Sequence, residues 1–152
     1  MTEAAISTAP RRPSSSKRHQ ARRLALQALY GHLLAGTQPN ELVTHLRGEE
    51  GFVRCDGDYF EQLLRGVLAE RLPLEQLFIG YLDRPLSQLD PVEHAVLLLA
   101  AYELAHCPEL PYRVAINEAV ELTKQFGATD GHRYINGVVD RLARKLRAAE
   151  ME

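Results

Sequence analysis

The sequence predicts an all-α fold in which about seven helices pack into one domain. Apolar residues recur at intervals of three and four along most of the chain, and helix-start signals precede several of these runs. Strand signals are almost absent, because no segment sustains an apolar–polar alternation and neither Asp-Gly pair lies between β-branched runs. With 152 residues, the chain is long enough to bury one sizeable core.

The N-terminus differs from the rest of the chain in composition and charge. Residues 1–16 are rich in Ser, Pro and Ala without an apolar period, so we expect a disordered tail at 1–16 and an ordered helical domain at 17–148. The first 23 residues hold six of the 18 cations and one of the 20 acids, which gives +5 there and −7 in the remainder. A basic arm on an acidic body favours contact with a polyanion. An Arg- and Ser-rich start also leaves a transit peptide open as an alternative.

A first helix is predicted from Ser16 or Lys17 to Gly36, which closes it. Arg18 and Arg22 stand four apart and therefore on one face, where they offer contacts to phosphate. The apolar positions that recur at helical spacing are Ala21, Leu24, Ala25, Ala28, Leu29 and Leu33.

Two further helices are expected before the middle of the chain. A short one covers about 40–46, and the polar, Gly-containing stretch 47–57 is a loop. Asp58 precedes Glu61 by three residues at the start of an apolar series, which is the capping-box pattern with Asp58 as N-cap. Pro73 interrupts that series, and a second apolar segment continues it in a new direction.

The clearest helix start lies at Asp90, which fits an N-cap, followed by Pro91 at the first helical position and Glu93 at the third. The helix beyond is apolar on nearly every side, so we expect it to be the central element of the core. Pro108 and Pro111 end this helix and begin the next.

The last two helices are amphipathic. The first is followed by Gly127 as a C′ glycine, and its predicted buried stripe is Ala115, Ile116, Ala119, Val120, Leu122 and Phe126. The final helix opens near Thr129 or Asp130, and its inward positions are Ile135, Val138, Val139, Leu142 and Leu146.

Motifs for catalysis and metal binding are missing from the sequence. None of the six His forms a metal-ligand spacing with another His or a Cys, and no P-loop, dinucleotide or nucleophile-elbow motif is present. We therefore expect no catalytic residue, metal or cofactor. Cys55 and Cys107 are expected as reduced, partly buried thiols. No apolar run approaches the ~20 residues of a membrane span, so we expect a cytoplasmic protein without a membrane partner.

A second candidate RNA patch surrounds the start of the last helix. Tyr134 could stack on an unpaired base, and Asp130 could accept hydrogen bonds from base-edge amino groups. The alternative is that Asp130 is only an N-cap and Tyr134 is only half-buried. Glu118, near the start of its helix, is interpreted as a first-turn acid on the helix dipole.

Four segments carry a resemblance to a known family: RRLALQALY at 22–30, LDPVEHAVLLLAAYEL at 89–104, PYRVAINEAVELTKQFG at 111–127 and DGHRYINGVVDRLA at 130–143. They resemble the NusB family of bacterial transcription antitermination proteins. The resemblance implies an all-α fold of two small helical subdomains. It also implies binding to the boxA element of ribosomal RNA leader transcripts, as a heterodimer with the ribosomal protein NusE. With other Nus factors and RNA polymerase, that complex prevents premature termination.

The resemblance also assigns site residues by position. The RNA-binding residues it implies, together with the basic residue that opens the helix, are Lys17, Arg18, Arg22, Tyr30, Glu118, Asp130 and Tyr134. The surface that faces NusE involves Tyr81 and Glu93. The basic cluster of the family is partly replaced here by His19 and Gln20, so RNA affinity without NusE is expected to be weak.

Two other functions fit the helical pattern. Ribosomal RNA cytosine methyltransferases carry a NusB-like domain ahead of a catalytic one, but the chain ends at Glu152 with a charged tail and without such a domain. A helical protein-interaction module without an RNA role is the other alternative, in which the basic arm would bind an acidic protein.

Overall fold

The computed structural model describes residues 15–49, 52 and 54–151, and within them the fold is all-α, with seven α-helices and no strand. The predicted fold class is confirmed. The α-helices are α1 (Ser15–Ala35), α2 (Pro39–Arg47), α3 (Gly57–Ala69), α4 (Arg71–Phe78), α5 (Pro91–His106), α6 (Tyr112–Phe126) and α7 (Gly131–Leu146). The described residues also contain the short 3-10 helices η2 (Ile79–Tyr81), η3 (Leu86–Gln88) and η4 (Ala149–Met151).

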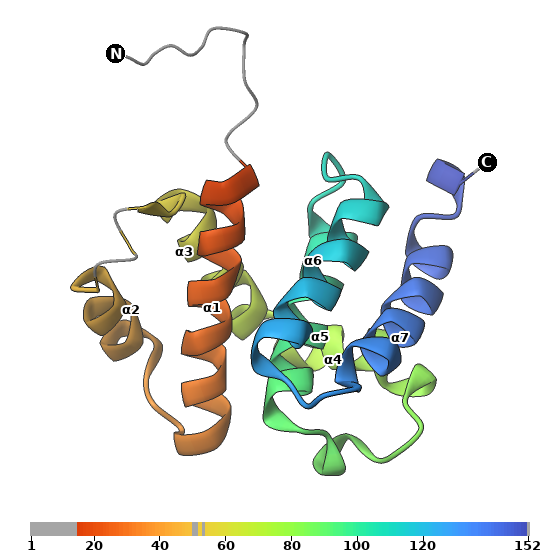
Figure 1. Cartoon of the computed structure of the whole chain (residues 1–152), viewed down its shortest axis with the longest axis horizontal. Helices are drawn as coiled ribbons and strands as arrows, with labels where there is room; N and C mark the ends of the chain where they lie inside the picture. The colour runs from red at the N-terminus through yellow and green to blue at the C-terminus, as the bar shows by residue number, and fades with distance from the viewer. Residues whose placement is uncertain (1–14, 50–51, 53, 152) are drawn as a thin grey trace, which may run out of the picture.

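The helices form two groups that share one core (Figure 1). On one side α1 packs against α2 and α3, and on the other side α5, α6 and α7 pack against one another, with α4 against α5. The groups meet where α1 and α3 contact α5. These contacts place the N-terminal half of α1 beside α6, which matters for the site described below.

Helix α5 is the central element, as predicted from its all-round apolar sequence. Every residue from Ala95 to Leu104 is buried, and the helix contacts α1, α3, α4, α6 and α7. Its start is also as predicted, because the Asp90 carboxylate accepts a hydrogen bond from the backbone N–H of Glu93 at 3.3 Å and Pro91 opens the helix.

The first helix begins slightly earlier than predicted, at Ser15, and ends at Ala35. Gly36 closes it with φ +68, a left-handed conformation that favours glycine, and donates its N–H to the carbonyl of His32 at 2.9 Å. The predicted disordered tail at 1–16 lies outside the described residues up to residue 14, and residues 15 and 16 belong to α1.

The start of α3 differs from the prediction. Asp56, not Asp58, is the N-cap, and its carboxylate accepts from the N–H of Tyr59 at 3.0 Å. Asp58 lies exposed inside the first turn, and Glu61 forms an ion pair with Arg47 rather than closing a capping box. The two aspartates are two residues apart, so either could have satisfied a free N–H of the first turn, and the turn that precedes α3 decides which one does.

We expect Asp56→Ala to lower the free energy of unfolding by about 1 kcal/mol, since it removes the side-chain acceptor at the helix start. Asp58→Ala is the matched control and should change stability by less than about 0.5 kcal/mol, because Asp58 caps no backbone donor. Urea unfolding followed by circular dichroism measures both. A larger loss in Asp58→Ala than in Asp56→Ala would contradict this cap.

Pro73 does not itself break the helix. The break lies three residues earlier, at Glu70, and Pro73 occupies the first turn of α4, where a missing N–H leaves no hydrogen bond unmade. The second apolar segment runs from this break through α4 and η2 to Tyr81.

The buried stripe of α6 is confirmed in part. Ala115, Ile116, Ala119 and Leu122 are buried, but Val120 is half-buried and Phe126, predicted to be inward, is 40% exposed. Thr123 is buried instead, and its hydroxyl donates to the carbonyl of Ala119 at 2.8 Å. Gly127 follows α6 in an extended conformation, φ −96 and ψ −174. A Cβ there would lie 2.9 Å from the carbonyl oxygen of Thr123, so close approach requires the glycine.

Candidate nucleic-acid interface

The N-terminal turn of α1 presents cations beside a tyrosine of α3. Lys17 is exposed, and the guanidinium of Arg18 lies 4.1 Å from the ring centroid of Tyr59. The Arg18 Nε is 3.7 Å from the Asp56 carboxylate, and the side chain keeps 28% of its surface exposed. Arg18 is therefore held in place by α3 while its outer edge remains open to an anion.

Arg22 is buried, unlike Arg18. This corrects the prediction that both side chains offer contacts to phosphate from one face of the helix. Its side chain is 3% exposed and donates through Nε to the Glu103 carboxylate of α5 at 2.8 Å. Burial disfavours its charge, but the carboxylates of Glu103 and Glu118 raise the pKa of Arg22 above its ordinary value. Arg22 is a buried cation that joins helices, and in this conformation it has no surface to offer phosphate.

Tyr59 completes the buried group around Glu103. Its hydroxyl donates to the same Glu103 carboxylate oxygen that Arg22 contacts. Burial and the Glu103 carboxylate raise the pKa of Tyr59, which keeps the phenol neutral and able to donate. The ring of Tyr59 therefore lies between a buried ion pair and the partly exposed guanidinium of Arg18.

Glu118 is an ion-pair partner of α1, and not the first-turn acid that its position suggested. It is the seventh residue of α6, beyond the reach of the helix-terminal charge. Its Oε1 lies 2.8 Å from Nδ1 of His19 and 3.5 Å from Nη1 of Arg22. Glu118 thus fixes the distance between α1 and α6.

An open groove of about 360 Å³ lies farther along α1 and is bordered by α5 and α6. Tyr30 and Phe126, each 40% exposed, are its aromatic walls. The groove is completed by Leu26, Gln27 and Val92. Two half-exposed aromatic rings around an open volume can stack on a flat, apolar group such as a base.

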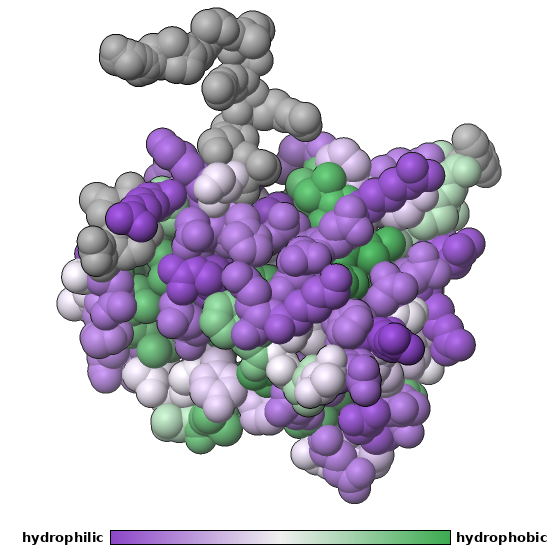
Figure 2. Space-filling view, in the orientation of Figure 1, coloured by the Kyte–Doolittle hydropathy of each residue, from purple (hydrophilic) through white to green (hydrophobic). Residues whose placement is uncertain are grey.

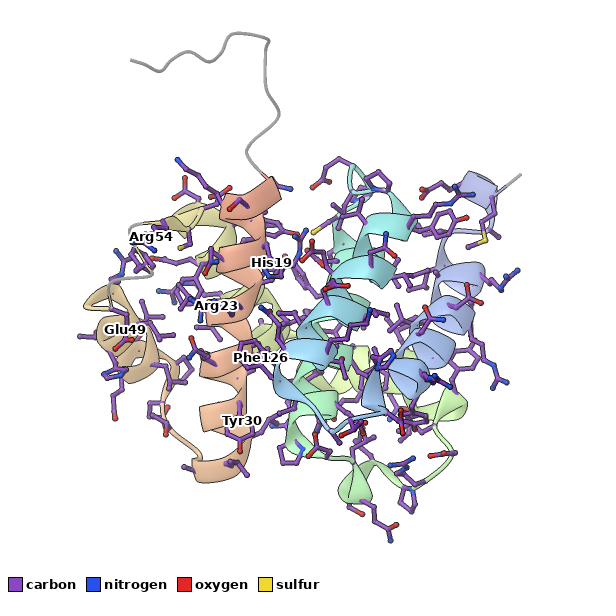
Figure 3. All side chains as sticks on the ribbon, viewed as in Figure 1. His19, Arg23, Tyr30, Glu49, Arg54 and Phe126 are labelled. Atoms are coloured by element: carbon purple, nitrogen blue, oxygen red, sulfur yellow. The ribbon has the colours of Figure 1, made fainter. Side chains whose placement is uncertain are left out.

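The cationic turn and the groove belong to the same side of the molecule. In Figure 3, His19, Phe126 and Tyr30 follow one another where α1 faces α6, and Arg23 lies on α1 toward α2 and α3. Arg23 is half-buried, and its Nε donates to the side-chain oxygen of Gln20 at 2.8 Å. Figure 2 shows that the surrounding surface is mostly hydrophilic, with apolar side chains in small separate patches. We call this strip, from Lys17 to Tyr30 and Phe126, the α1–α6 face.

The second predicted patch lies at the start of α7. Asp130 is exposed and precedes α7 without making a side-chain cap, so its carboxylate is open to an external donor. Tyr134 is half-buried, and its hydroxyl accepts from the N–H of Asp83 at 3.2 Å. The guanidinium of Arg84 lies 4.5 Å from its ring centroid. Stacking of a base on that face of Tyr134 requires Arg84 to move aside.

The two residues predicted to face a protein partner differ in exposure. Tyr81 is half-buried in η2, but Glu93 is only 5% exposed. Burial, and next the nearby Asp90, raise the pKa of Glu93. A Cβ at Gly131 would lie 2.9 Å from the Glu93 carboxylate, so this acid sits under the start of α7. The Tyr134–Asp83 contact joins the same regions, and the second patch therefore adjoins the Tyr81 surface.

Among the described residues, no three His, Cys, Asp or Glu side chains gather in a way that could hold a metal ion. Cys55 and Cys107 are both buried and free. None of the helices in the same part of the chain is long and apolar enough to cross a bilayer.

A family model described as NusB family matches residues 19–144, which is most of the chain and includes every predicted site residue except Lys17 and Arg18. The chain belongs to the NusB family. The resemblance found in the four sequence segments is therefore confirmed. The chain is 50% identical over 139 residues to the transcription antitermination protein NusB of Ralstonia pickettii, and the match covers 91% of this chain and 90% of the relative. It is 49% identical over 141 residues to the protein of the same name from Bordetella pertussis, with 90% and 92% covered.

Solved NusB structures share the fold of this family member. T. maritima NusB superposes with a TM-score of 0.72 and 28% identity, covering 84% of this chain and 91% of that one. A second structure, reported as the antitermination factors NusB and NusE in complex with dsRNA, superposes with a TM-score of 0.73 and 20% identity, covering 87% and 99%. At that identity the second likeness establishes the fold alone.

Sequence reasoning missed two residues of the α1–α6 face of this NusB-family chain. Phe126 had been placed in the core because it continues the period of α6, although it is the last residue of the helix and lies in the groove. Arg23 was not selected, although Arg22 beside it was. The sequence did indicate that Arg22 is the buried one of the two, since it stands three, four and seven residues before apolar residues that are buried in α1.

Proposed function

We propose that this NusB-family protein binds the boxA element of ribosomal RNA leader transcripts together with NusE. With other Nus factors, this complex prevents premature termination by RNA polymerase in the cytoplasm. The observation that carries the proposal is the α1–α6 face, where one exposed and two half-buried cations precede a groove with aromatic walls on the same helix. The protein acts by binding, without a catalytic residue, metal or cofactor of its own.

Phosphate contacts come from the exposed end of α1. Lys17, Arg18 and Arg23 keep part of their side chains accessible, and each can approach a separate phosphate. Arg22 acts indirectly, because with Glu103 it fixes Tyr59, on whose ring Arg18 rests. Glu118 acts in the same way through His19. These contacts supply affinity for RNA of any sequence.

Base recognition comes from the aromatic groove and from the start of α7. Tyr30 and Phe126 offer stacking surfaces for an unpaired base. Asp130 can accept from an exocyclic amino group, and Tyr134 offers a further ring once Arg84 leaves it. These contacts discriminate boxA from other sequences.

The surface for NusE includes Tyr81 and its neighbours in α4 and η2. Leu72 is 72% exposed and Ile79 is 39% exposed in this region, which provides apolar area for a protein partner. Glu93 supports this surface from below, since it is buried under the start of α7. NusE bound here lies next to Tyr134, so that RNA can contact both proteins.

Binding to a boxA RNA and to a scrambled RNA of equal length, with and without NusE and across a salt series, tests the proposal. The expected result is tighter binding to boxA in the presence of NusE. Tyr134→Ala should weaken boxA binding by about 1–3 kcal/mol, and scrambled RNA by less. Arg23→Gln should weaken both RNAs alike and lower the salt slope by about 0.7. Equal affinity of the wild-type complex for both RNAs would contradict the proposal.

A further inference from the structure

Helix α7 and the residue that follows it hold the densest group of cations outside the N-terminal segment. Six of the 18 Lys and Arg lie in the first 23 residues, which leaves 12 cations for the rest of the chain, against 19 of the 20 acids. Five of these 12 cations lie between residues 131 and 147, where Asp140 is the only acid. Four of the five, all except the buried Arg147, are exposed. Figure 2 shows a largely hydrophilic surface along α7, which Figure 1 places at one edge of the molecule.

Three of these cations lie along one inclined ridge of the helix. Arg133, Arg141 and Lys145 are separated by eight and four residues, so the row rises about 18 Å along the helix while it turns by about 120° around it. No ion pair within the described residues engages any of the three, whereas Arg144 beside them pairs with Asp140 at 2.9 Å. A single strand that rises ~3.4 Å per nucleotide carries about five phosphates over that length.

The position in the middle of the row is a glycine. Gly137 lies between Arg133 and Arg141, and a Cβ built there meets nothing within 4 Å. Glycine inside a helix weakens it relative to alanine, and no neighbour among the described residues requires its small size. An exposed glycine between cations lets a ligand's backbone approach the helix closely.

The row also continues the second predicted patch. Arg133 adjoins Tyr134 and lies one turn from Asp130, and the row leads from there toward the C-terminal end of α7. Asn136, Gly137, Arg141 and Lys145 make up the exposed surface along it, without an aromatic or aliphatic side chain. A protein interface normally needs such apolar anchors at its centre. The chemistry therefore matches a regular polyanion better than an acidic protein.

We propose that the exposed side of α7 binds the phosphate backbone of RNA that flanks the recognised element, independently of its sequence. The inference rests on the proposed function and extends it, because it assigns α7 to nucleotides outside boxA. Arg133, Arg141 and Lys145 each neutralise a phosphate, and Gly137 permits the close approach between them.

The test compares three RNAs bound by the full-length protein with NusE: the boxA element alone, and the element extended by about five nucleotides at its 5′ or its 3′ end. One extended RNA should bind more tightly than the element alone. In Arg141→Gln/Lys145→Gln that advantage should disappear, and the salt slope for the extended RNA should fall by about 1.4, while the short RNA binds as before. In the wild type, these two contacts raise the affinity for the extended RNA relative to the short one, and this gain in affinity should fall about sevenfold between 50 mM and 200 mM salt.

Two further variants separate the row from a general charge effect. Arg47→Gln/Arg65→Gln removes two exposed cations on the side of α2 and α3 and should leave the advantage intact. Gly137→Gln keeps every charge and should still reduce the advantage, with a folded far-UV spectrum as control. Extensions that add no affinity, or equal losses on short and extended RNA in the α7 variant, overturn the inference. Weakened assembly with NusE without RNA would instead make the row a protein contact. Failure of the proposed function itself shows separately, as loss of preference for boxA over scrambled RNA in the wild type.

Discussion

Glu103→Ala is expected to lower the free energy of unfolding by about 3–5 kcal/mol, the range for breaking a buried ion pair from one side. The change leaves the Arg22 guanidinium, 3% exposed, without its 2.8 Å partner, and leaves the Tyr59 hydroxyl without its acceptor. Glu118, at 3.5 Å from Arg22, compensates only in part because it also pairs with His19. Urea unfolding followed by circular dichroism measures the loss as a lower midpoint at an unchanged slope.

A combined variant tests whether the loss comes from the uncompensated charge. Arg22→Met/Tyr59→Phe/Glu103→Leu removes all three polar groups and should recover most of the stability, because an apolar replacement of a whole buried pair is often neutral. The combined variant should still bind RNA less well than the wild type, since the ring at position 59, on which Arg18 rests, loses the hydrogen bond to Glu103 that holds it in place. A single Glu103→Ala variant within 1 kcal/mol of the wild type would contradict the role assigned to the pair.

The predictable parts of the fold were those with local causes. Helix α5 followed from a cap and a proline next to each other and from a run of residues without a polar side. The end of α1 followed from Gly36, whose left-handed backbone is a local requirement. The predicted N-cap of α3 was wrong for the opposite reason. Two nearby aspartates fit the local pattern equally well, and the preceding turn places Asp56 at the N-cap.

The site was harder to predict because its contacts join distant parts of the chain. The partner of Arg22 is 81 residues away, and the partner of His19 is 99 residues away. A helical period places a residue on a face, but it does not say which helix covers that face. Arg22 and Phe126 were therefore misplaced in opposite directions, one buried where exposure was expected and the other exposed where burial was expected. Family resemblance gives positions, but it does not say which of them would touch a ligand and which would hold others in place.

Arg147→Ala is expected to lower the free energy of unfolding by about 3 kcal/mol, because the side chain closes the C-terminal end of α5. Its guanidinium is buried and donates to four backbone carbonyls at 2.9–3.2 Å, those of Glu103, Leu104, Cys107 and Leu110. For a domain of this size the melting temperature should fall by about 6–12 °C. Differential scanning calorimetry measures the change.

Arg144→Ala is the matched control, since that side chain is 69% exposed and pairs only with Asp140. It should change stability by less than about 0.5 kcal/mol. Arg147→Lys keeps the charge but lacks the planar fork that reaches several carbonyls together, and should recover less than half of the loss. Equal effects of the alanine changes at 144 and 147 would mean that the carbonyls find other donors. From the sequence alone both arginines belong to the same basic helix end, and only the packing of α7 beside the end of α5 makes one of them structural.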